Sequence, residues 1–401
     1  MKTIGIVAEY NPFHTGHAWH IQETRRQFRE ETAVVAVISG NWVQRGECAV
    51  TDKWTRTEAA LAGGVDLVLE LPTVWATASA EGFARGAVAI LAATGVVDTL
   101  SFGSECGEIA PLCELARCLN SLEFSQALRR VLGPKQSFAQ CRRRAVESLL
   151  GTDTAALLDT PNNNLGVEYL RFLPPGMEAI TVPRFGAGHD SSSEEDGLPS
   201  ASLLRHRLRT GEVTGVSPFL PLSWKGEAAD MKWLERALIA RLRSMTLEEA
   251  EALPDSGDGL ATRLLCAARQ TASLEQLYAL TKTRTYAHAR VRRLALYALL
   301  DLREADRPAS PPYIRVLGFN RRGRDVLREM NQRAALPFSV KPAHIPRFSP
   351  EAQALFALEE RFTDLFALCF PTPRPCGLEW TTGPVMENRA ASCRPPVEEN
   401  L

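Results

Sequence analysis

Short apolar runs alternate with amphipathic segments over the first 104 residues. Residues 33–39 are almost continuously apolar, as in strands of a parallel sheet that is covered on both faces. Strands that alternate with helices indicate right-handed βαβ units. The predicted strands are residues 4–9, 33–39, 66–70 and 99–102, and the predicted helices are 17–29, 53–62 and 80–94. The chain therefore begins with a Rossmann-like α/β domain.

The pattern changes twice further along the chain. Residues 108–150 are helical in pattern, 161–166 form an Asn-rich turn before a helix at 167–172, and 179–182 form a fifth strand. After about residue 213 the alternation stops. Helices are expected at 231–243, 247–253, 259–270, 273–280, 287–302, 321–330 and 351–370, with short strands at 313–317 and 338–341.

This pattern predicts three regions. Residues 1–212 form the α/β domain, 213–370 a mainly α-helical and basic region, and 371–401 a loosely ordered, Pro-rich tail. The acidic, serine-rich stretch 190–197 is predicted to be a mobile loop.

Composition narrows the class of protein. The chain is 45% hydrophobic and 23% charged, and its net charge is only −1, so any contact with a polyanion must use local basic patches. It lacks both a signal-peptide pattern and the ~20-residue apolar run of a membrane span. The nine cysteines are scattered and include no Cys-x-x-Cys pair. We therefore expect a cytoplasmic protein with no disulfide framework, membrane segment or metal site.

Candidate chemistry is concentrated directly after the first strand. There, Glu9 leads into a loop containing His14, Gly16 and His17, and a helix follows. A helix N-terminus offers free N–H groups to a phosphate, and Gly16 would let the backbone approach it closely. His14 and His17 are the predicted catalytic residues, because imidazole donors can stabilise the charge that develops on an α-phosphate and its leaving pyrophosphate.

A second phosphate-sized pocket is predicted where a helix begins near residue 200. Ser200 or Ser202 is the expected N-cap, and Arg205 one turn later can act as a charged fork. Together with the histidine loop, this pair favours adenylyl transfer, in which a nucleophile attacks the α-phosphorus of ATP. The chain contains no G-x-x-x-x-G-K-[ST] and no strand-linked G-x-G-x-x-G, which argues against a P-loop or a dinucleotide site.

Several other residues at strand ends and helix starts are candidates with open alternatives. Arg45 suits a substrate or phosphate contact or an ordinary salt bridge, and Lys53 and Arg56 are favoured as site residues because they begin a helix. Asn162 and Asn163 could read adenine or ribose, or could simply form a turn.

Three basic segments suit phosphate contacts to RNA, although charge runs are often only solvated helix faces. They are residues 142–144, residues 282–293, which include Arg284, Arg290, Arg292 and Arg293, and residues 321–324. Arg45, Lys53 and Arg56 join the predicted tRNA contacts.

The motifs resemble those of the tRNA(Met) cytidine acetate ligase family over residues 1 to about 370. The resemblance is carried by Glu-Tyr-Asn-Pro-Phe-His-x-Gly-His at 9–17, Gln-Arg-Gly-Glu at 44–47, Lys-Trp-x-Arg-Thr at 53–57, Pro-Asn-Asn at 161–163, Arg-x-Gly-Ala-Gly at 184–188 and Arg-Val-Leu-Gly-Phe-Asn at 315–320. His-x-Gly-His and Ser-x-Ser-x-x-Arg are shared more widely, with the nucleotidyltransferase superfamily. The chain departs from the family at Asn164, where an apolar residue is usual, and in its acidic loop after Asp190.

The resemblance implies a HIGH-type nucleotidyltransferase domain followed by an RNA-binding region. It implies that ATP activates acetate as acetyl-adenylate, which then acetylates N4 of the wobble cytidine, C34, of elongator tRNA(Met). The residues leave open the oligomeric state and whether Mg²⁺ accompanies the nucleotide. ATP would be held by Val7, Ala8, Glu9, Tyr10, Asn11, Pro12, Phe13, His14, Thr15, Gly16, His17, Ala18, Trp19 and His20, with Gly103, Asn162 or Asn163, and Arg184. From the residues themselves, we add Ser202 and Arg205.

Two other functions remain open from the sequence. One is an adenylyltransferase for a small phosphorylated metabolite, which would not need a basic helical region. The other is an RNA-binding protein that uses ATP as a switch.

Overall fold

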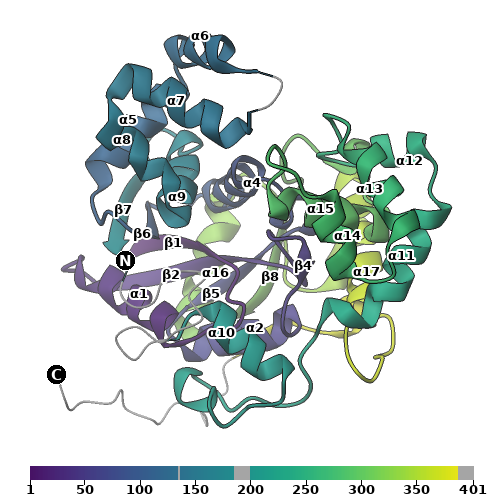
Figure 1. Cartoon of the computed structure of the whole chain (residues 1–401). Coiled ribbons are helices and arrows are strands. Elements are labelled where there is room, and N and C mark those ends of the chain that lie inside the picture. The colour runs from purple at the N-terminus through teal and green to yellow at the C-terminus, as the bar shows by residue number, and fades with distance from the viewer. Residues whose placement is uncertain (134–135, 185–198, 387–401) are drawn as a thin grey trace.

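A twisted eight-stranded sheet forms the centre of the computed structural model, which describes residues 1–133, 136–184 and 199–386 (Figure 1). The strand order is β10-β8-β5-β2-β1-β6-β7, and β9 pairs with β8. All these pairs are parallel except β5 with β8. The strands are β1 (Lys2–Ala8), β2 (Thr32–Ser39), β5 (Leu67–Leu71), β6 (Thr99–Ser104), β7 (Glu178–Pro183), β8 (Ile314–Phe319), β9 (Phe338–Ser339) and β10 (Val385–Met386), and a separate hairpin consists of β3 (Trp42–Val43) and β4 (Glu47–Cys48).

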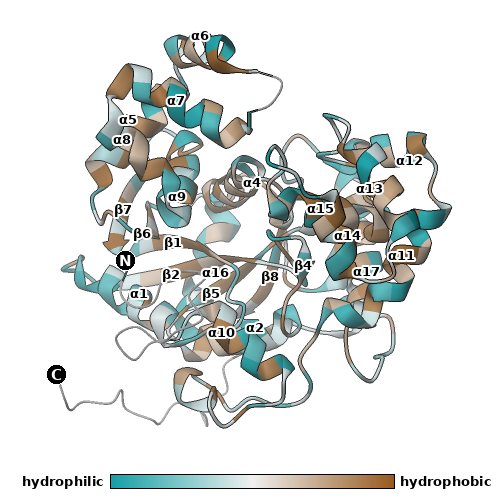
Figure 2. Cartoon of the chain, viewed as in Figure 1, coloured by the Kyte–Doolittle hydropathy of each residue, from teal (hydrophilic) through white to brown (hydrophobic). Residues whose placement is uncertain are grey.

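The apolar run in β2 is explained by packing on both faces of the sheet. Val35 and Val37 belong to the same core cluster as residues of α4, whereas Val34, Ala36 and Ile38 pack with residues of α1 and α2. Every residue of β2 is buried. The predicted α/β class with a parallel sheet is therefore confirmed, and Figure 2 shows the apolar strands enclosed by helices with polar outer faces.

The helices lie in two groups beside the sheet (Figure 1). One group, α5 to α9, packs next to β6 and β7, and the other, α11 to α15 with α17, lies towards the opposite end of the sheet. The helices are α1 (Thr15–Arg26), α2 (Lys53–Ala62), α3 (Thr73–Ala76), α4 (Ala80–Ala93), α5 (Ile109–Leu119), α6 (Leu122–Val131), α7 (Phe138–Leu150), α8 (Thr152–Ala156), α9 (Pro161–Arg171), α10 (Ala201–Arg209), α11 (Glu235–Ser244), α12 (Leu247–Glu251), α13 (Leu260–Gln270), α14 (Leu274–Thr281), α15 (His288–Leu300), α16 (Arg321–Arg333), α17 (Pro350–Phe366) and α18 (Leu378–Thr381).

The sheet crosses both region boundaries that the sequence pattern suggested. β8 comes from the region expected to be a separate helical domain, and it pairs antiparallel with β5. β10 comes from the segment expected to be a loose tail, and it pairs with β8. Residues 378–386 are thus part of the folded core region, whereas 387–401 lie outside the described residues.

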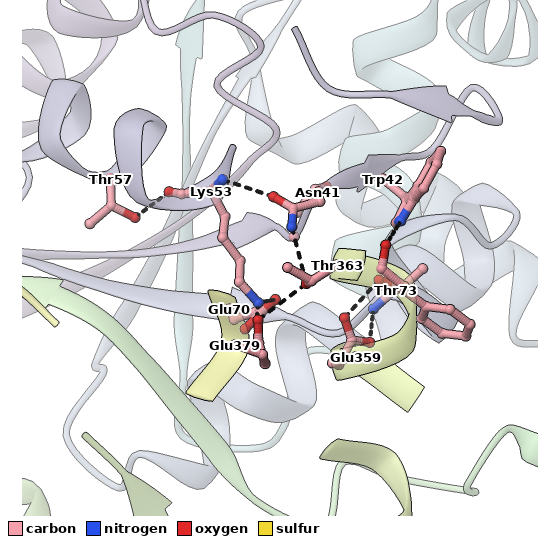
Figure 3. Close-up of polar contacts among 12 residues, drawn as sticks. Asn41, Trp42, Lys53, Thr57, Glu70, Thr73, Glu359, Thr363 and Glu379 are labelled. Carbon is pink, nitrogen blue, oxygen red and sulfur yellow. Dashed lines mark hydrogen bonds and ion pairs between the residues drawn. The ribbon is translucent and has the colours of Figure 1, made fainter. Parts of the chain in front are cut away.

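A buried ion cluster anchors this C-terminal segment to α2 (Figure 3). Nζ of Lys53 lies 2.6 Å from Glu70 Oε1 and 2.7 Å from Glu379 Oε1, and all three side chains are almost completely buried. Asn41 connects the cluster to α17, because its Oδ1 accepts from Lys53 N at 2.9 Å and its Nδ2 donates to Thr363 Oγ1 at 3.1 Å. The cluster therefore joins the sheet, α2, α17 and α18.

The predicted Asn-rich turn is wrong. Residues 161–166 are the first turns of α9, which begins at Pro161. Proline suits the first position of a helix because its missing N–H would have no partner there. The remaining predicted elements are present with ends shifted by a few residues; the stretch 190–197, predicted to be a mobile loop, lies outside the described residues.

Candidate active site

A cavity of about 390 Å³ opens at the carboxyl ends of β1, β6 and β7. Parallel α/β sheets bind ligands at this edge. The cavity is lined by the histidine loop, by the β3–β4 hairpin, and by the beginnings of α4, α9 and α10. The strand-end loops that the sequence singled out are therefore brought together around one site.

His14 and His17 cap α1 with their own rings. His14 is the N-cap residue, and its Nδ1 accepts a hydrogen bond from Gly16 N at 3.1 Å. Nδ1 of His17 accepts from the backbone N–H of His14 at 3.2 Å, which completes a capping box. A ring nitrogen that accepts carries no proton, so the proton of each neutral ring is on Nε2. Both rings line the cavity.

Gly16 is required by this cap. A Cβ atom at position 16 would lie 2.9 Å from Cε1 of the His14 ring. The sequence analysis expected glycine to make room for a ligand, but in this structure the space beside Gly16 holds the His14 imidazole. Glycine at position 16 therefore makes room for the His14 ring.

The run 7–20 has two kinds of residue. Val7, Ala8, Glu9, Tyr10, Asn11, His14, Gly16, His17, Trp19 and His20 line the cavity, whereas Pro12, Phe13, Thr15 and Ala18 are not among its described lining residues. Phe13 instead packs in the core, with its ring centroid 4.7 Å from that of Tyr10.

His20 is a neutral group. Burial, followed by the charge of Arg184, lowers the pKa of its imidazole to about 4. Its Nε2 lies 3.2 Å from Ser101 Oγ, which in turn lies 2.7 Å from Thr24 Oγ1. His20 can therefore exchange hydrogen bonds with an uncharged part of a ligand.

Asn162 and Asn163 have different environments. Asn162 lines the cavity, where its Oδ1 accepts from Arg184 Nη1 at 2.9 Å. Asn163 is buried, and its Oδ1 accepts from the backbone N–H groups of Glu105 and Cys106. In turn, the Glu105 carboxylate accepts hydrogen bonds from the backbone N–H groups of both asparagines. Asn162, Arg184 and Gly103 thus form one wall of the cavity.

Arg205 joins α10 to the loop after β1. Ser200 is the N-cap of α10 and accepts from Leu203 N at 3.1 Å. Arg205 donates from Nη1 to the carbonyl oxygen of Asn11 at 2.8 Å and from Nη2 to Ser202 Oγ at 2.9 Å. Ser200 and Arg205 line the cavity, and Ser202 is not among its described lining residues. Ser202 therefore contacts a residue that lines the cavity, Arg205.

Glu9 ends the first strand and lines the cavity. Its Oε1 accepts from Gln44 N at 3.0 Å, and its carbonyl oxygen accepts from Arg56 Nη1 at 2.7 Å. Burial raises the pKa of its carboxyl group above the ordinary value, although Arg205, the Gln44 N–H and Arg45 offset part of this effect.

Comparison with known proteins places this geometry in a family. Residues 1–377 match the model of the HIGH Nucleotidyl Transferase family. The chain is 34% identical over 395 residues to the tRNA(Met) cytidine acetate ligase of Caldanaerobacter subterraneus subsp. tengcongensis, covering 92% of this chain and 96% of that protein. It is 35% identical over 403 residues to the protein of the same name from Alkaliphilus metalliredigens, covering 92% and 94%. The chain belongs to the tRNA(Met) cytidine acetate ligase family.

Solved structures of a family member have the same fold. The apo structure of Thermotoga maritima TmcAL matches with a TM-score of 0.91 at 31% identity, covering 96% of this chain and 99% of that one. The structure of the same protein bound with alpha-thio ATP matches with a TM-score of 0.87 at 30% identity and the same coverage. The resemblance found in the sequence motifs is thus confirmed.

Lys53 and Arg56 differ from their expected placement. Both carry the family's Lys-Trp-x-Arg-Thr motif, but both are buried: Lys53 lies in the ion cluster, and Arg56 donates to the carbonyl groups of Thr51, Glu9, Ser39 and Gly40. Burial alone would lower the pKa of Lys53, but Glu379 and Glu70 outweigh it, and the pKa is raised. Neither side chain reaches the surface, so direct tRNA contact does not fit this structure.

The β3–β4 hairpin, which carries Arg45, connects the cavity to the basic segment at residues 282–293. Gly46 has a φ of +74°, and a Cβ there would lie 2.5 Å from the backbone nitrogen of Arg293. Arg45 lines the cavity on the other side of the same turn. The beginning of α15 therefore packs directly on the turn that borders the site.

The predicted RNA contacts in the basic segment are not equally available. Arg284 is exposed. Arg290 pairs with Asp258 at 3.0 Å, Arg293 is buried against Asp255 at 3.1 Å, and the guanidinium of Arg292 lies 5.5 Å from the ring centroid of Tyr278. Arg142, from another basic cluster, pairs with the buried Glu168 at 2.7 Å. Much of the apparent charge is therefore already paired.

Sequence reasoning missed several residues of the cavity wall. Phe83, Asn164, Leu165 and Tyr169 line the cavity but were not among the candidates. Which face of α9 or α4 meets the site depends on long-range packing, and nothing in the local pattern shows it.

The described residues give no sign of a resident metal or of a membrane segment. Within 1–133, 136–184 and 199–386, no group of three or more His, Cys, Asp or Glu side chains is arranged to hold a metal ion. Within the same ranges, no helix is long and apolar enough to cross a membrane. The eight described cysteines are free thiols, while Cys393 lies outside the described residues.

Proposed function

We propose that this protein is a cytoplasmic, ATP-dependent ligase that acetylates N4 of the wobble cytidine of elongator tRNA(Met) through acetyl-adenylate. The observation that carries the proposal is the pair of histidines that cap α1 at the mouth of the cavity. Relatives named tRNA(Met) cytidine acetate ligase and a neighbouring structure bound with alpha-thio ATP support it.

In this proposal the nucleotide lies along the first wall of the cavity. The triphosphate would meet the N-terminus of α1, where the dipole and the Nε2–H groups of His14 and His17 favour negative charge. Asn162 and Arg184, joined at 2.9 Å, would hold the nucleoside side, with His20 nearby as a neutral partner. Mg²⁺ would enter as the counter-ion of the triphosphate, which an exchange assay with and without Mg²⁺ can test.

Two steps follow from this placement. First, an acetate oxygen attacks the α-phosphorus, the bond to pyrophosphate breaks, and acetyl-adenylate forms. His14 and His17 would stabilise the charge that moves onto the phosphate oxygens. Second, the amine of a flipped cytidine attacks the acetyl carbon, and AMP leaves with the bonding electrons.

The tRNA would approach from the α15 side. The turn at Gly46 joins the cavity to the basic segment, so Arg45 would contact the end of the substrate nearest the reaction. Arg284, which is exposed, would contact phosphates farther out, with Arg290 and Arg292 at its side. Lys53, Arg56 and the buried Arg293 would act only through the fold.

One incubation tests the whole proposal. The protein is mixed with ATP, acetate and an elongator tRNA(Met) transcript, and the digested tRNA is examined by nucleoside mass spectrometry. The expected result is N4-acetylcytidine that requires all three substrates. Adenylylation of a small metabolite without tRNA binding, or tRNA binding with no acetylated product, would instead support the two alternative functions.

A further inference from the structure

We infer that Glu9 is the group that binds the N4 amine of the acceptor cytosine and accepts its proton during acetyl transfer. The inference deepens the proposed function and rests on it. The N–H groups of the histidine loop donate hydrogen bonds, so another side chain is needed to accept the proton from N4.

The chemistry of acetyl transfer requires a proton acceptor. When the N4 amine attacks the acetyl carbon of acetyl-adenylate, a C–N bond forms and the C–O bond to AMP breaks. AMP takes the electron pair, and the nitrogen must lose one proton to leave a neutral amide. The step therefore needs an acceptor within hydrogen-bond reach of N4. A carboxylate is also the group that most directly reads the N4–H₂ edge of cytosine.

The carboxylates at the cavity differ in their hydrogen-bond and ion-pair partners. Glu47 lines the cavity, but its Oε2 lies 3.5 Å from Arg209 Nη1 in an ion pair. Glu105 is held by Asn162 and Asn163 and is not among the described lining residues. Glu9 lines the cavity, and only its Oε1 is used, by Gln44 N. Its Oε2 has no hydrogen-bond partner in the part of the chain that the structure describes.

The position of Glu9 in the cavity also suits this role. Glu9 precedes the histidine cap by five residues and is tied by Gln44 to the hairpin that carries Arg45. Gln44 and Arg45 are on the side of the cavity where α15 packs, which is the proposed entry side of tRNA. Asn162 and Arg184 form the nucleotide wall. Glu9 thus lies where the two substrates of the second step would meet.

Burial and several charged neighbours act on the Glu9 carboxyl group. Burial raises the pKa of its carboxyl group, which brings it closer to the working pH than that of an exposed glutamate. The charged and titratable groups that act on it or are affected by it come from several elements: Arg205 on α10, Arg45 and Glu47 on the hairpin, Arg56 on α2 and Tyr169 on α9.

The test measures the two steps of the reaction separately in the Glu9→Gln variant. The amide oxygen of glutamine can still accept from Gln44 N, but the amide NH₂ cannot take a proton from N4. The first step is measured as acetate-dependent ATP–pyrophosphate exchange. The second step is measured as single-turnover transfer from added acetyl-adenylate to the elongator tRNA(Met) transcript. Glu178→Gln, an exposed glutamate on β7, is the matched control.

We expect transfer to fall by about 100-fold or more, the usual range for a lost general base, and to fall by a clearly larger factor than exchange. The wild-type transfer rate should rise with pH through one ionisation that Glu9→Gln lacks, and Glu9→Asp should retain more transfer than Glu9→Gln. Unchanged transfer, or an equal loss in both steps, would overturn the inference. Absence of acetylation by the wild-type protein would instead refute the proposed function, and the inference with it.

Discussion

The backbone N–H of His14 donates to Nδ1 of His17 at 3.2 Å, so the two histidines of the loop cap the helix that they begin. Nδ1 of His14 is used in the same way by Gly16 N. Each ring is thereby held by its Nδ1 side, and the proton of the neutral ring is on Nε2. One set of contacts therefore orients two donors at a helix N-terminus.

Replacing His17 should affect chemistry more than folding. His17→Ala removes one donor and one half of the capping box, so acetate-dependent ATP–pyrophosphate exchange should fall by roughly 10²–10³-fold. The free energy of unfolding should fall by only about 1 kcal/mol, the usual cost of a lost cap. His344→Ala, outside the cavity lining, is the control. Unchanged exchange in His17→Ala would refute the role of the histidine cap.

Substitutions of Asn162 and Asn163 should have different effects, one on ATP binding and the other on stability. Asn162→Ala removes a cavity-lining group and should raise the KM for ATP several-fold with little effect on unfolding. Asn163→Ala leaves the N–H groups of Glu105 and Cys106 without their acceptor and should cost about 1–3 kcal/mol in urea unfolding. If the two variants showed the same pattern, the division between them would be wrong.

Glu359 should make the protein less stable as pH rises. Burial, and then the charge of Glu70, raises the pKa of its carboxyl group to about 8 from the ordinary 4.5. The native state thus holds a proton that the unfolded chain loses first. Stability from this group is complete below about pH 4.5 and is lost progressively up to about pH 8.

The check is the free energy of unfolding measured between pH 5 and 8. Glu359→Gln should show a shallower decline than wild type, because it cannot ionise. Glu351→Gln, an exposed position on the same helix, should decline as wild type does. Equal slopes for wild type and Glu359→Gln would contradict the assigned pKa direction.

Arg284 should contribute to tRNA affinity through charge alone. Arg284→Ala should weaken binding of the elongator tRNA(Met) transcript and reduce the slope of log K against log salt concentration by about 0.7–0.9. Arg333→Ala is a suitable comparison, because this exposed arginine on α16 is paired with Glu329 at 2.5 Å. An unchanged slope in Arg284→Ala would place the tRNA elsewhere.

Local patterns predicted the elements well because their causes are local. The apolar run in β2 and the helix over 53–62 follow from residue order alone, and so does the meeting of strand-end loops at one edge of a parallel sheet. The histidine loop could be recognised as a phosphate site from its position after a strand. That its rings cap the helix could not be read, since this depends on rotamers.

Long-range partners could not be predicted. Lys53 was favoured as a site residue because it begins a helix, yet its side chain is buried in an ion pair with Glu379, which is 326 residues away in sequence. For the same reason, separation from their partner strands in sequence, the pattern did not show that β8 and β10 join the sheet. Asn162 and Asn163 are adjacent and alike in sequence, but Asn162 accepts from Arg184 at the cavity, whereas Asn163 accepts from the backbone N–H groups of Glu105 and Cys106.

In the proposed reaction, acetate attacks the α-phosphorus of ATP in the cavity at the histidine cap. Incubation with acetate labelled with ¹⁸O at both oxygens, together with ATP and the elongator tRNA(Met) transcript, tests it by mass spectrometry of the nucleotide product. We predict AMP carrying one ¹⁸O atom, formed in step with N4-acetylcytidine. Acetylated tRNA accompanied by unlabelled AMP, or by ADP and labelled inorganic phosphate, would contradict it.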